Sequence, residues 1–207
     1  AFSADGGASF TLDSGITEPI HAVGWFVDQY VAAGGTASGD GVLYTSNDGI
    51  TWTVSTSSAL PTGKALTGLA VDADNEYIYI TGEGGVLLKG EKSSGSVSLA
   101  ALTLPGSPAG AINTVAVLGP DHIAVAGASN YYAESLDGGD TWFQPSIPGS
   151  AAINGIAGRA GVRSIVATGS VLADRTIMNK NEYKAIEIQN GATISGTWLS
   201  LAISCKE

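Results

Sequence analysis

The sequence has one cysteine, Cys205, and few cationic residues, and each shortage excludes a class of protein. A single cysteine cannot form an intrachain disulfide, which excludes a disulfide-stapled secreted scaffold. Nine Lys and Arg stand against 19 Asp and Glu, so the formal net charge is −10. That charge opposes docking on nucleic acid or on anionic lipid. We therefore expect no nucleic-acid partner, and a buried or tail thiol rather than a nucleophile at Cys205.

Long hydrophobic runs are missing as well. The longest apolar stretches, such as YIYI at 77–80 and GVLL at 85–88, are too short to cross a bilayer as a helix. No basic segment precedes an apolar one, so no targeting segment is visible. We expect a soluble chain without membrane insertion. The sequence leaves its localisation open, and also whether a signal was removed before Ala1.

The chain does contain a repeat of about 45 residues. Four apolar segments each end in a glycine, and these glycines are separated by 48, 45 and 42 positions: Gly34, Gly82, Gly127 and Gly169. Another apolar segment precedes each of them, with starts separated by 46, 46 and 41 positions: Ile20, Leu66, Ile112 and Ile153. Two independent spacings give one period. Short apolar segments between turns rich in Gly and Pro predict strands, and no helix.

Four short strands in each repeat of this length predict an all-β propeller with four-stranded blades. The predicted units are residues 20–65, 66–111, 112–152 and 153–190. Residues 1–19 and 191–207 would share a fifth blade that closes the ring, which makes 1–207 a single domain without an open sheet edge. The alternatives are a ring of four blades and an open arc that a partner completes.

The stretch SLDGGDTW at 135–142 resembles the Asp-box, or bacterial neuraminidase repeat. The pattern is carried by Ser135, Asp137, Gly139, Thr141 and Trp142. Two looser copies exist: TLDSGIT keeps Thr11, Asp13, Gly15 and Thr17, and SNDGITW keeps Ser46, Asp48, Gly49, Thr51 and Trp52. The chain therefore resembles the Asp-box β-propeller superfamily, in particular its non-enzymatic sialidase-like and photosystem II assembly factor-like members. The basic surface patch of the assembly factors is not matched by nine scattered cations.

The Asp-box residue types indicate a structural turn. Asp accepts hydrogen bonds from nearby backbone N–H groups, Gly adopts a backbone conformation that costs other residues energy, and Trp buries a large apolar surface. The resemblance implies that such turns join the third and fourth strands, away from a ligand site. The carboxylates of Asp13, Asp48 and Asp137 fall in three different units and cannot share one ion. We predict no metal and no cofactor.

Enzyme functions lack the residues that they need. The resemblance to sialidases implies three arginines gathered from different blades, but Arg159, Arg163 and Arg175 all fall in the fourth unit. No pair of carboxylates can be nominated for glycoside hydrolysis. His21 and His122 have no metal-ligand spacing and no Ser or Cys partner. We predict no catalytic residues and no enzyme activity.

One segment is a candidate for ligand binding. In ASNYYAE at 128–134, Tyr131 and Tyr132 could stack on a sugar and Asn130 could hydrogen-bond to it. The same tyrosines could equally be strand residues that pack between blades.

We predict a non-catalytic structural or recognition module of a larger assembly, whose partners are other protein subunits. The acidic composition, rich in Gly, Ala, Ser and Thr, resembles that of bacteriophage virion proteins such as tail or capsid appendages. The alternative is a carbohydrate-binding lectin or a glycoside hydrolase-like protein with glycans as partners. Loops that differ in length between units argue against the equivalent pockets of a lectin.

Overall fold

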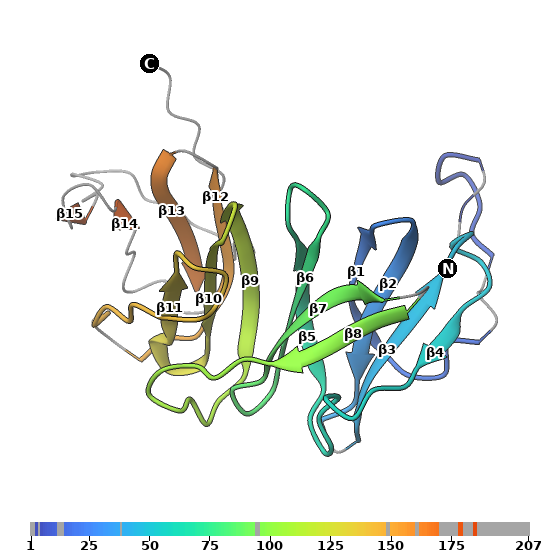
Figure 1. Cartoon of the computed structure of the whole chain (residues 1–207), viewed down its shortest axis with the longest axis horizontal. Coiled ribbons are helices and arrows are strands. Elements are labelled where there is room, and N and C mark those ends of the chain that lie inside the picture. The colour runs from blue at the N-terminus through green and yellow to red at the C-terminus, as the bar shows by residue number, and fades with distance from the viewer. Residues whose placement is uncertain are drawn as a thin grey trace.

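The computed structural model of the chain describes residues 3, 5–11, 15–37, 39–93, 96–147, 150–159, 162–169, 178–179 and 184–185. Within these residues the fold is all-β, and the only helical segment is one 3-10 turn, Ala128–Asn130. The strands form four antiparallel sheets, each a meander in chain order (Figure 1). The predicted all-β class is confirmed.

The first sheet comprises β1 (Ile20–Phe26), β2 (Gln29–Gly35), β3 (Gly41–Ser46) and β4 (Thr53–Ser55). The second comprises β5 (Leu66–Val71), β6 (Tyr77–Gly82), β7 (Leu87–Ser93) and β8 (Ser96–Ala101). The third comprises β9 (Ile112–Gly119), β10 (His122–Gly127) and β11 (Tyr132–Ser135), and a bridge from Glu134 to Phe143 extends it. The fourth comprises β12 (Ile153–Arg159), β13 (Val162–Gly169), β14 (Met178–Asn179) and β15 (Lys184–Ala185).

The four sheets follow one another in an arc. The first strand of each sheet contacts the first strand of the next, in the order β1, β5, β9 and β12. The first and fourth sheets lie at opposite ends of this row (Figure 1). The predicted closing blade needs residues 191–207, which lie outside the described residues, so the number of blades and the closure stay predictions.

Hydrophobic cores fill the spaces between neighbouring sheets. Ile78 and Ile80 of β6 face the first sheet, whereas Tyr79 between them faces the third. Successive side chains of a strand point to opposite faces, so a central strand contributes to two cores. A third core joins the third sheet to Ile153 and Ile156 of β12. Each interior sheet is therefore stabilised from both sides.

The repeated glycines have a steric cause. A Cβ atom built on Gly34 would lie 1.9 Å from the Pro19 carbonyl oxygen, and one built on Gly127 would lie 2.0 Å from that of Ala111. No side chain fits so close to backbone. The close approach lets the residue after each glycine donate its N–H to the same carbonyl, from Gly35 to Pro19 and from Ala128 to Ala111, both at 2.9 Å.

A second device recurs in all four sheets at the start of the first strand. The register skips one residue there, which is the mark of a β-bulge. The skipped residues are polar in every case: His21, Thr67, Asn113 and Asn154. We call these four residues the inter-sheet ladder, because their side chains reach the neighbouring sheet.

The ladder bonds link each first strand to the next one. The Leu66 carbonyl accepts from Nδ1 of His21 at 2.7 Å, because a carbonyl can only accept. The hydroxyl of Thr67 donates to the carbonyl of Ile112, and Nδ2 of Asn113 donates to that of Ile153 at 3.0 Å. In each case the acceptor is the carbonyl of the first residue in the first strand of the next sheet. The bulges join consecutive sheets through hydrogen bonds that repeat with the sequence period.

Candidate functional site

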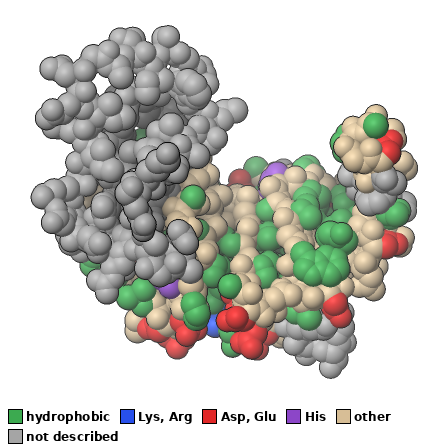
Figure 2. Space-filling view, turned by 90° about the horizontal axis from the view of Figure 1, so that it is seen from above, with side chains coloured by type: hydrophobic (Ala, Val, Ile, Leu, Met, Phe, Trp, Pro, Cys, Tyr) green, Lys and Arg blue, Asp and Glu red, His purple; other side chains and the backbone are tan. Residues whose placement is uncertain are grey.

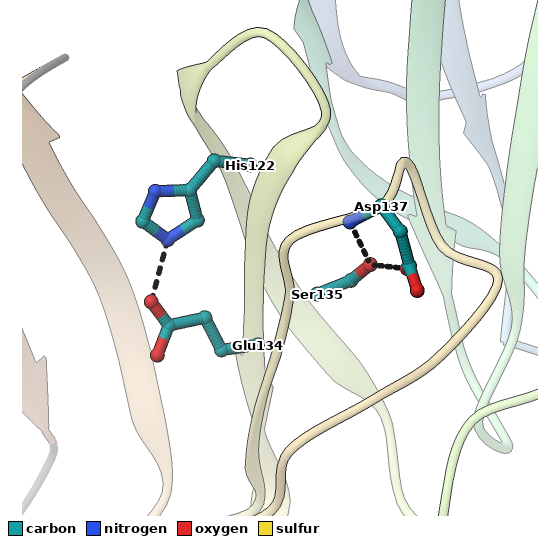
Figure 3. A network of polar contacts seen from close by, with 4 residues as sticks. All are labelled: His122, Glu134, Ser135 and Asp137. Atoms are coloured by element: carbon teal, nitrogen blue, oxygen red, sulfur yellow. Dashed lines mark hydrogen bonds and ion pairs between the residues drawn. The ribbon is translucent and has the colours of Figure 1, made fainter.

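Residues 135–142 form a turn held by hydrogen bonds of its own side chains, and Figure 3 shows those of Ser135 and Asp137. The hydroxyl of Ser135 donates to Oδ1 of Asp137 at 2.7 Å and accepts from the N–H of Gly139 at 2.8 Å. Asp137 accepts from both the N–H and the hydroxyl of Thr141. The indole N–H of Trp142 donates to the Gly139 carbonyl at 3.0 Å. We call this segment the third-sheet Asp turn.

Residues 46–52 repeat the arrangement after β3, and we call them the first-sheet Asp turn. The Ser46 hydroxyl donates to Oδ1 of Asp48 at 2.9 Å and accepts from the N–H of Gly49. Oδ1 of Asp48 also accepts from the N–H groups of Ile50 and Thr51 at 2.8 and 2.7 Å. The indole N–H of Trp52 donates to Gly49, at 3.2 Å. With one residue fewer, this copy keeps the serine and tryptophan bonds, and its aspartate accepts from two backbone N–H groups instead of the N–H and hydroxyl of one threonine.

The hydrogen bonds favour the charged form of both carboxylates. Donation from Thr141, and then from Ser135, lowers the pKa of Asp137 to about 2. Backbone N–H groups of Thr51 and Ile50, and then the Ser46 hydroxyl, lower the pKa of Asp48 to about 2. Each carboxylate is engaged by its own turn. Both Asp turns can therefore stabilise their hairpins as local structures.

The third copy is only partly described. Asp13 lies outside the described residues, so its turn stays a prediction. Gly15 has a φ of +100°, and a Cβ built on it would lie 2.5 Å from the Trp52 carbonyl oxygen. The hydroxyls of Thr17 and Tyr44 are hydrogen-bonded at 3.1 Å. Residues 15–17 thus lie against the first sheet, close to the first-sheet Asp turn. Thr11 is exposed.

The candidate ligand residues 130–132 lie around the start of β11. Tyr131 and Tyr132 are both buried, Tyr131 in the core shared with the second sheet and Tyr132 in the core shared with the fourth. The Tyr131 hydroxyl donates to the Pro105 carbonyl at 2.9 Å. Burial raises the pKa of Tyr131 to about 12 and, together with Glu134, raises that of Tyr132 further. The geometry favours the packing interpretation, and a ligand role for Asn130, Tyr131 and Tyr132 stays an unsupported prediction.

His122 has a partner that its sequence position did not reveal. Its Nε2 lies 2.5 Å from Oε1 of Glu134 on the neighbouring strand (Figure 3). Glu134 is almost fully buried, whereas His122 is about one-fifth exposed. A buried carboxylate needs such a partner, because unpaired charge is costly inside a protein. His122 and Glu134 come from adjacent strands rather than adjacent residues, so only strand pairing brings them together.

Carboxylates gather around Lys89 and Tyr77 where the second and third sheets meet. The Lys89 ammonium lies 4.0 Å from the centroid of the Tyr77 ring, in cation–π contact, and donates to the Gly138 carbonyl at 3.4 Å. The pKa of Tyr77 is raised, chiefly by the nearby carboxylate of Glu91 and next by burial. Three further carboxylates contribute less: Glu76, Asp121 and Asp72. Within the described residues, no group of three His, Cys, Asp or Glu residues is placed to hold a metal ion.

A hydrophobic sheet face was missed at the sequence level. On the side of the first sheet that faces away from the second, Val23, Trp25, Tyr30 and Val54 are exposed. Trp25 and Tyr30 are in edge-to-face contact, with ring centroids 4.7 Å apart. Figure 2 shows hydrophobic side chains over this end of the molecule. We call these four residues the open face. Their apolar character is visible in the sequence, but their exposure is not.

Four consecutive antiparallel meanders, joined through their first strands, define a propeller-like fold. Among solved structures the chain is similar to YCF48 from Cyanidioschyzon merolae, a β-propeller, with a TM-score of 0.58 and 20% sequence identity. The match covers 77% of this chain and 51% of that one, so the chain spans about half the length of YCF48. At this identity the similarity shows the fold alone.

No protein-family model matches the sequence, and neither does any curated protein. The part of the chain that the structure describes contains no helix long and apolar enough to cross a membrane.

Proposed function

We propose that the chain is a non-catalytic structural or recognition module with a propeller-like fold, which acts within a larger protein assembly. The observation that carries this proposal is the pair of Asp turns, each of which holds a large apolar side chain in solvent. Ile50 is 44% exposed on the first-sheet turn, and Leu136 is 64% exposed on the third-sheet turn. Single exposed apolar residues are common. Here each lies in a hydrogen-bonded turn, and the two turns occupy matching places of the repeat, although the residues differ in their position within the turn.

Such turns suit protein recognition for an energetic reason. Ordering a flexible loop on binding costs free energy, whereas a turn held by its own hydrogen bonds has already been ordered in folding. Interfaces combine apolar contacts with a polar rim. The acidic side chains around Lys89 and Tyr77 lie next to the third-sheet turn, since the N–H of Gly138 donates to the Asp121 carbonyl at 2.8 Å. A protein partner with apolar and basic groups would match this surface.

The Asp-box assignment belongs to the same proposal. We infer that the structural Asp-box residues are those of the two Asp turns and those of a third, looser copy: Ser46, Asp48, Gly49, Trp52, Ser135, Asp137, Gly139, Thr141 and Trp142, with Thr11, Asp13 and Gly15. The hydrogen bonds of the two Asp turns support this role. A single propeller domain of five blades, closed by residues 1–19 and 191–207, is part of the proposal.

Two narrower hypotheses rest on less. A place in a bacteriophage virion is suggested by composition alone. Carbohydrate binding by a lectin or a glycosidase-like protein would require free aromatic faces or paired carboxylates, and the burial of Tyr131 and Tyr132 gives it no support.

The test is the native mass of the purified chain and of the complex from which it is isolated, by light scattering with mass spectrometry of co-purifying species. We expect a stoichiometric complex with other protein subunits. The double variant Ile50→Ser/Leu136→Ser should lose the complex, and Ser98→Ala on the exposed side of β8 should keep it. A chain that stays a monomer, or a complex that survives the double variant, would overturn the proposal.

A further inference from the structure

We propose that the N-terminal Asp turn, formed by residues 3 and 5–10, is a recognition element that presents the side chain of Phe10 to a partner protein. The part of the partner that receives Phe10 is an apolar pocket bordered by basic groups. This inference rests on the assembly role proposed above and deepens it, because it adds a contact and specifies the charge of the partner. All residues of this turn that carry the inference are described by the structure.

The N-terminal Asp turn has the hydrogen bonds of the third-sheet Asp turn, and it was missed at the sequence level. Oδ1 of Asp5 accepts from the Ser3 hydroxyl at 2.8 Å and from the Ser9 N–H at 2.9 Å, and Oδ2 accepts from the Ser9 hydroxyl at 2.6 Å. The Ser3 hydroxyl accepts from the Gly7 N–H at 2.7 Å. Donation from Ser9, and then from Ser3, lowers the pKa of Asp5 to about 2. The turn is therefore ordered by its own bonds.

The spacing assigns this turn to the repeat. Ser3 precedes Ser46 by 43 positions, which is one period, and Ser46 precedes Ser135 by 89 positions, which is two. The two glycines of the N-terminal turn have φ values of +72° and +94°, and those of the third-sheet turn have +71° and +104°. The N-terminal turn is thus a further copy of the same structural unit.

Phe10 occupies the position at which the other two Asp turns have tryptophan. The indole N–H of Trp142 donates to a glycine carbonyl of its own turn at 3.0 Å, and that of Trp52 does so at 3.2 Å. Phenylalanine has no N–H group in its side chain, so it cannot make this bond. Phe10 is 68% exposed, more than any other large hydrophobic residue that the structure describes, whereas Trp52 and Trp142 are half-buried. The aromatic ring is available to another molecule.

The N-terminal Asp turn lies clear of the rest of the chain. A Cβ built on Gly6 or Gly7 would meet no atom within 4 Å beyond its chain neighbours, whereas one on Gly139 would lie 2.6 Å from Cδ1 of Leu102. Residues 5–10 are all exposed, and the turn projects from the end of the molecule that the first sheet forms (Figure 1). An ordered turn loses little conformational entropy on binding, and aromatic residues are enriched in the cores of interfaces. Phe10 can therefore act as an anchor.

The charge of the first part of the chain defines the partner. Residues 1–63 contain six Asp and Glu and no Lys or Arg, and the first cation is Lys64. Complementary charge steers association, whereas like charge across an interface opposes it. A protein with an apolar pocket and basic groups fits this region. A second copy of the chain would bring the same acidic residues and does not fit.

Unfolding of the isolated chain tests whether Phe10 is available. Phe10→Ser should leave the midpoint of urea unfolding unchanged. Trp142→Ser should lower it, because Trp142 packs against the core between the second and third sheets. A loss of stability from Phe10→Ser equal to that from Trp142→Ser would overturn the proposal, since Phe10 would then pack within its own fold.

Binding to the co-purifying subunit tests the contact itself. That subunit is separated from the chain and recombined with each variant, and titration calorimetry gives the dissociation constant. Phe10→Ser should raise this constant about 30-fold or more, the loss expected for a residue that dominates an interface. Ala8→Ser in the same turn is the matched control and should change it less than about twofold. Asp5→Ala keeps Phe10 but removes the bonds of the turn, and should raise it about threefold to tenfold.

Salt tests the charge of the partner. Raising the sodium chloride concentration from about 0.05 M to about 0.5 M should weaken binding of the unmodified chain about tenfold, because salt screens exposed charges. Binding that neither Phe10→Ser nor salt weakens would overturn this inference, and the proposed function would survive if Ile50→Ser/Leu136→Ser still lost the complex. A dimer of the isolated chain that Phe10→Ser dissociates would overturn the inference as well, because it would assign the turn to a second copy. An unmodified chain that forms no complex would overturn both proposals.

Discussion

Val23 and Val115 occupy the same position in the first and third sheets, and their surroundings differ. Each is the fourth residue of its first strand, and each lies opposite an apolar residue of the second strand, Ala32 for Val23 and Val125 for Val115. Val115 is 8% exposed, because the second sheet covers it, whereas Val23 is 58% exposed. The repeat makes the two valines equivalent. A neighbouring sheet alone decides which of them is buried.

The comparison separates two kinds of interaction. The bond between serine and aspartate in the Asp turns and the close contacts at Gly34 and Gly127 arise within one sheet, so both sheets have them. Burial of the outer face arises between sheets and therefore depends on whether another sheet packs over it. Substitutions at matching positions can test this division.

The largest difference is expected from a charge at the two valines. Val115→Asp should lower the free energy of unfolding by about 4 kcal/mol, because it places an unpaired carboxylate between two sheets. Val23→Asp should cost less than about 1 kcal/mol if the open face stays in solvent, and nearly as much as Val115→Asp if a fifth sheet covers it. Urea unfolding of both variants measures the difference. A small effect of Val115→Asp would contradict the packing between the second and third sheets.

The glycines should behave alike in the two sheets. Gly34→Ala and Gly127→Ala should each cost about 2–3 kcal/mol, because the new methyl group would overlap a backbone carbonyl. Gly119→Ala in β9 is the matched control, since its nearest neighbour is the His122 Cβ at 3.9 Å. Thermal and urea unfolding of the three variants give the comparison. Equal stability of Gly127→Ala and Gly119→Ala would show that the close approach is absent.

Both Asp turns should lose stability in acid over the same range. The pKa of Asp48 and of Asp137 is about 2 in the folded chain, below the ordinary value of 3.8. A lowered pKa means that the carboxylate stabilises the fold above its ordinary pKa and loses this effect as the pH falls toward about 2. We expect Asp48→Asn and Asp137→Asn each to reduce the loss of stability between about pH 4 and about pH 2. The free energy of unfolding of each variant is measured across that pH range. A loss of stability in acid equal to that of the unmodified chain would contradict the prediction.

The smallest effect is expected at the inter-sheet ladder. Asn113→Ala should cost about 1 kcal/mol, because the Ile153 carbonyl loses its donor from the side chain. Asn154→Ala should cost less, because it removes only the Oδ1 atom that accepts from Nδ2 of Asn113 and leaves the bond to the Ile153 carbonyl. The two variants are compared by the midpoint of urea unfolding. An Asn113→Ala variant as stable as the unmodified chain would mean that these bonds contribute nothing measurable.

Much of the fold could be predicted from particular residues. The spacing of Gly34, Gly82, Gly127 and Gly169 located the second strand of each sheet, because each glycine ends an apolar segment. The pattern of residues 135–142 predicted a turn after a third strand, since its bonds join residues at most four positions apart. The structural role of Asp48 and Asp137 was predicted for the same reason, because an aspartate in such a turn accepts hydrogen bonds from nearby backbone N–H groups.

Other features had no local signal. The pairing of His122 with Glu134 depends on the register of β10 and β11, and the sequence alone left His122 without a partner. The ladder residues His21, Thr67 and Asn113 are of different types, so the sequence shows no motif that relates them. Their equivalence follows from the β-bulge that each occupies in its first strand. The sites of Tyr131 and Tyr132 were left open between a ligand and a core, and burial on two faces of β11 favours the core.

The sequence by itself determined the period, the all-β class and the turn chemistry, because these depend on apolar alternation and on hydrogen bonds between residues close in the chain. Only the tertiary structure decided which faces are covered. Contacts between sheets join residues about 45 positions apart, and Val23 and Val115 show that equal side chains at equal positions acquire different burial from their neighbours. Free energy from apolar burial depends on the area removed from water, which is a property of the assembled sheets.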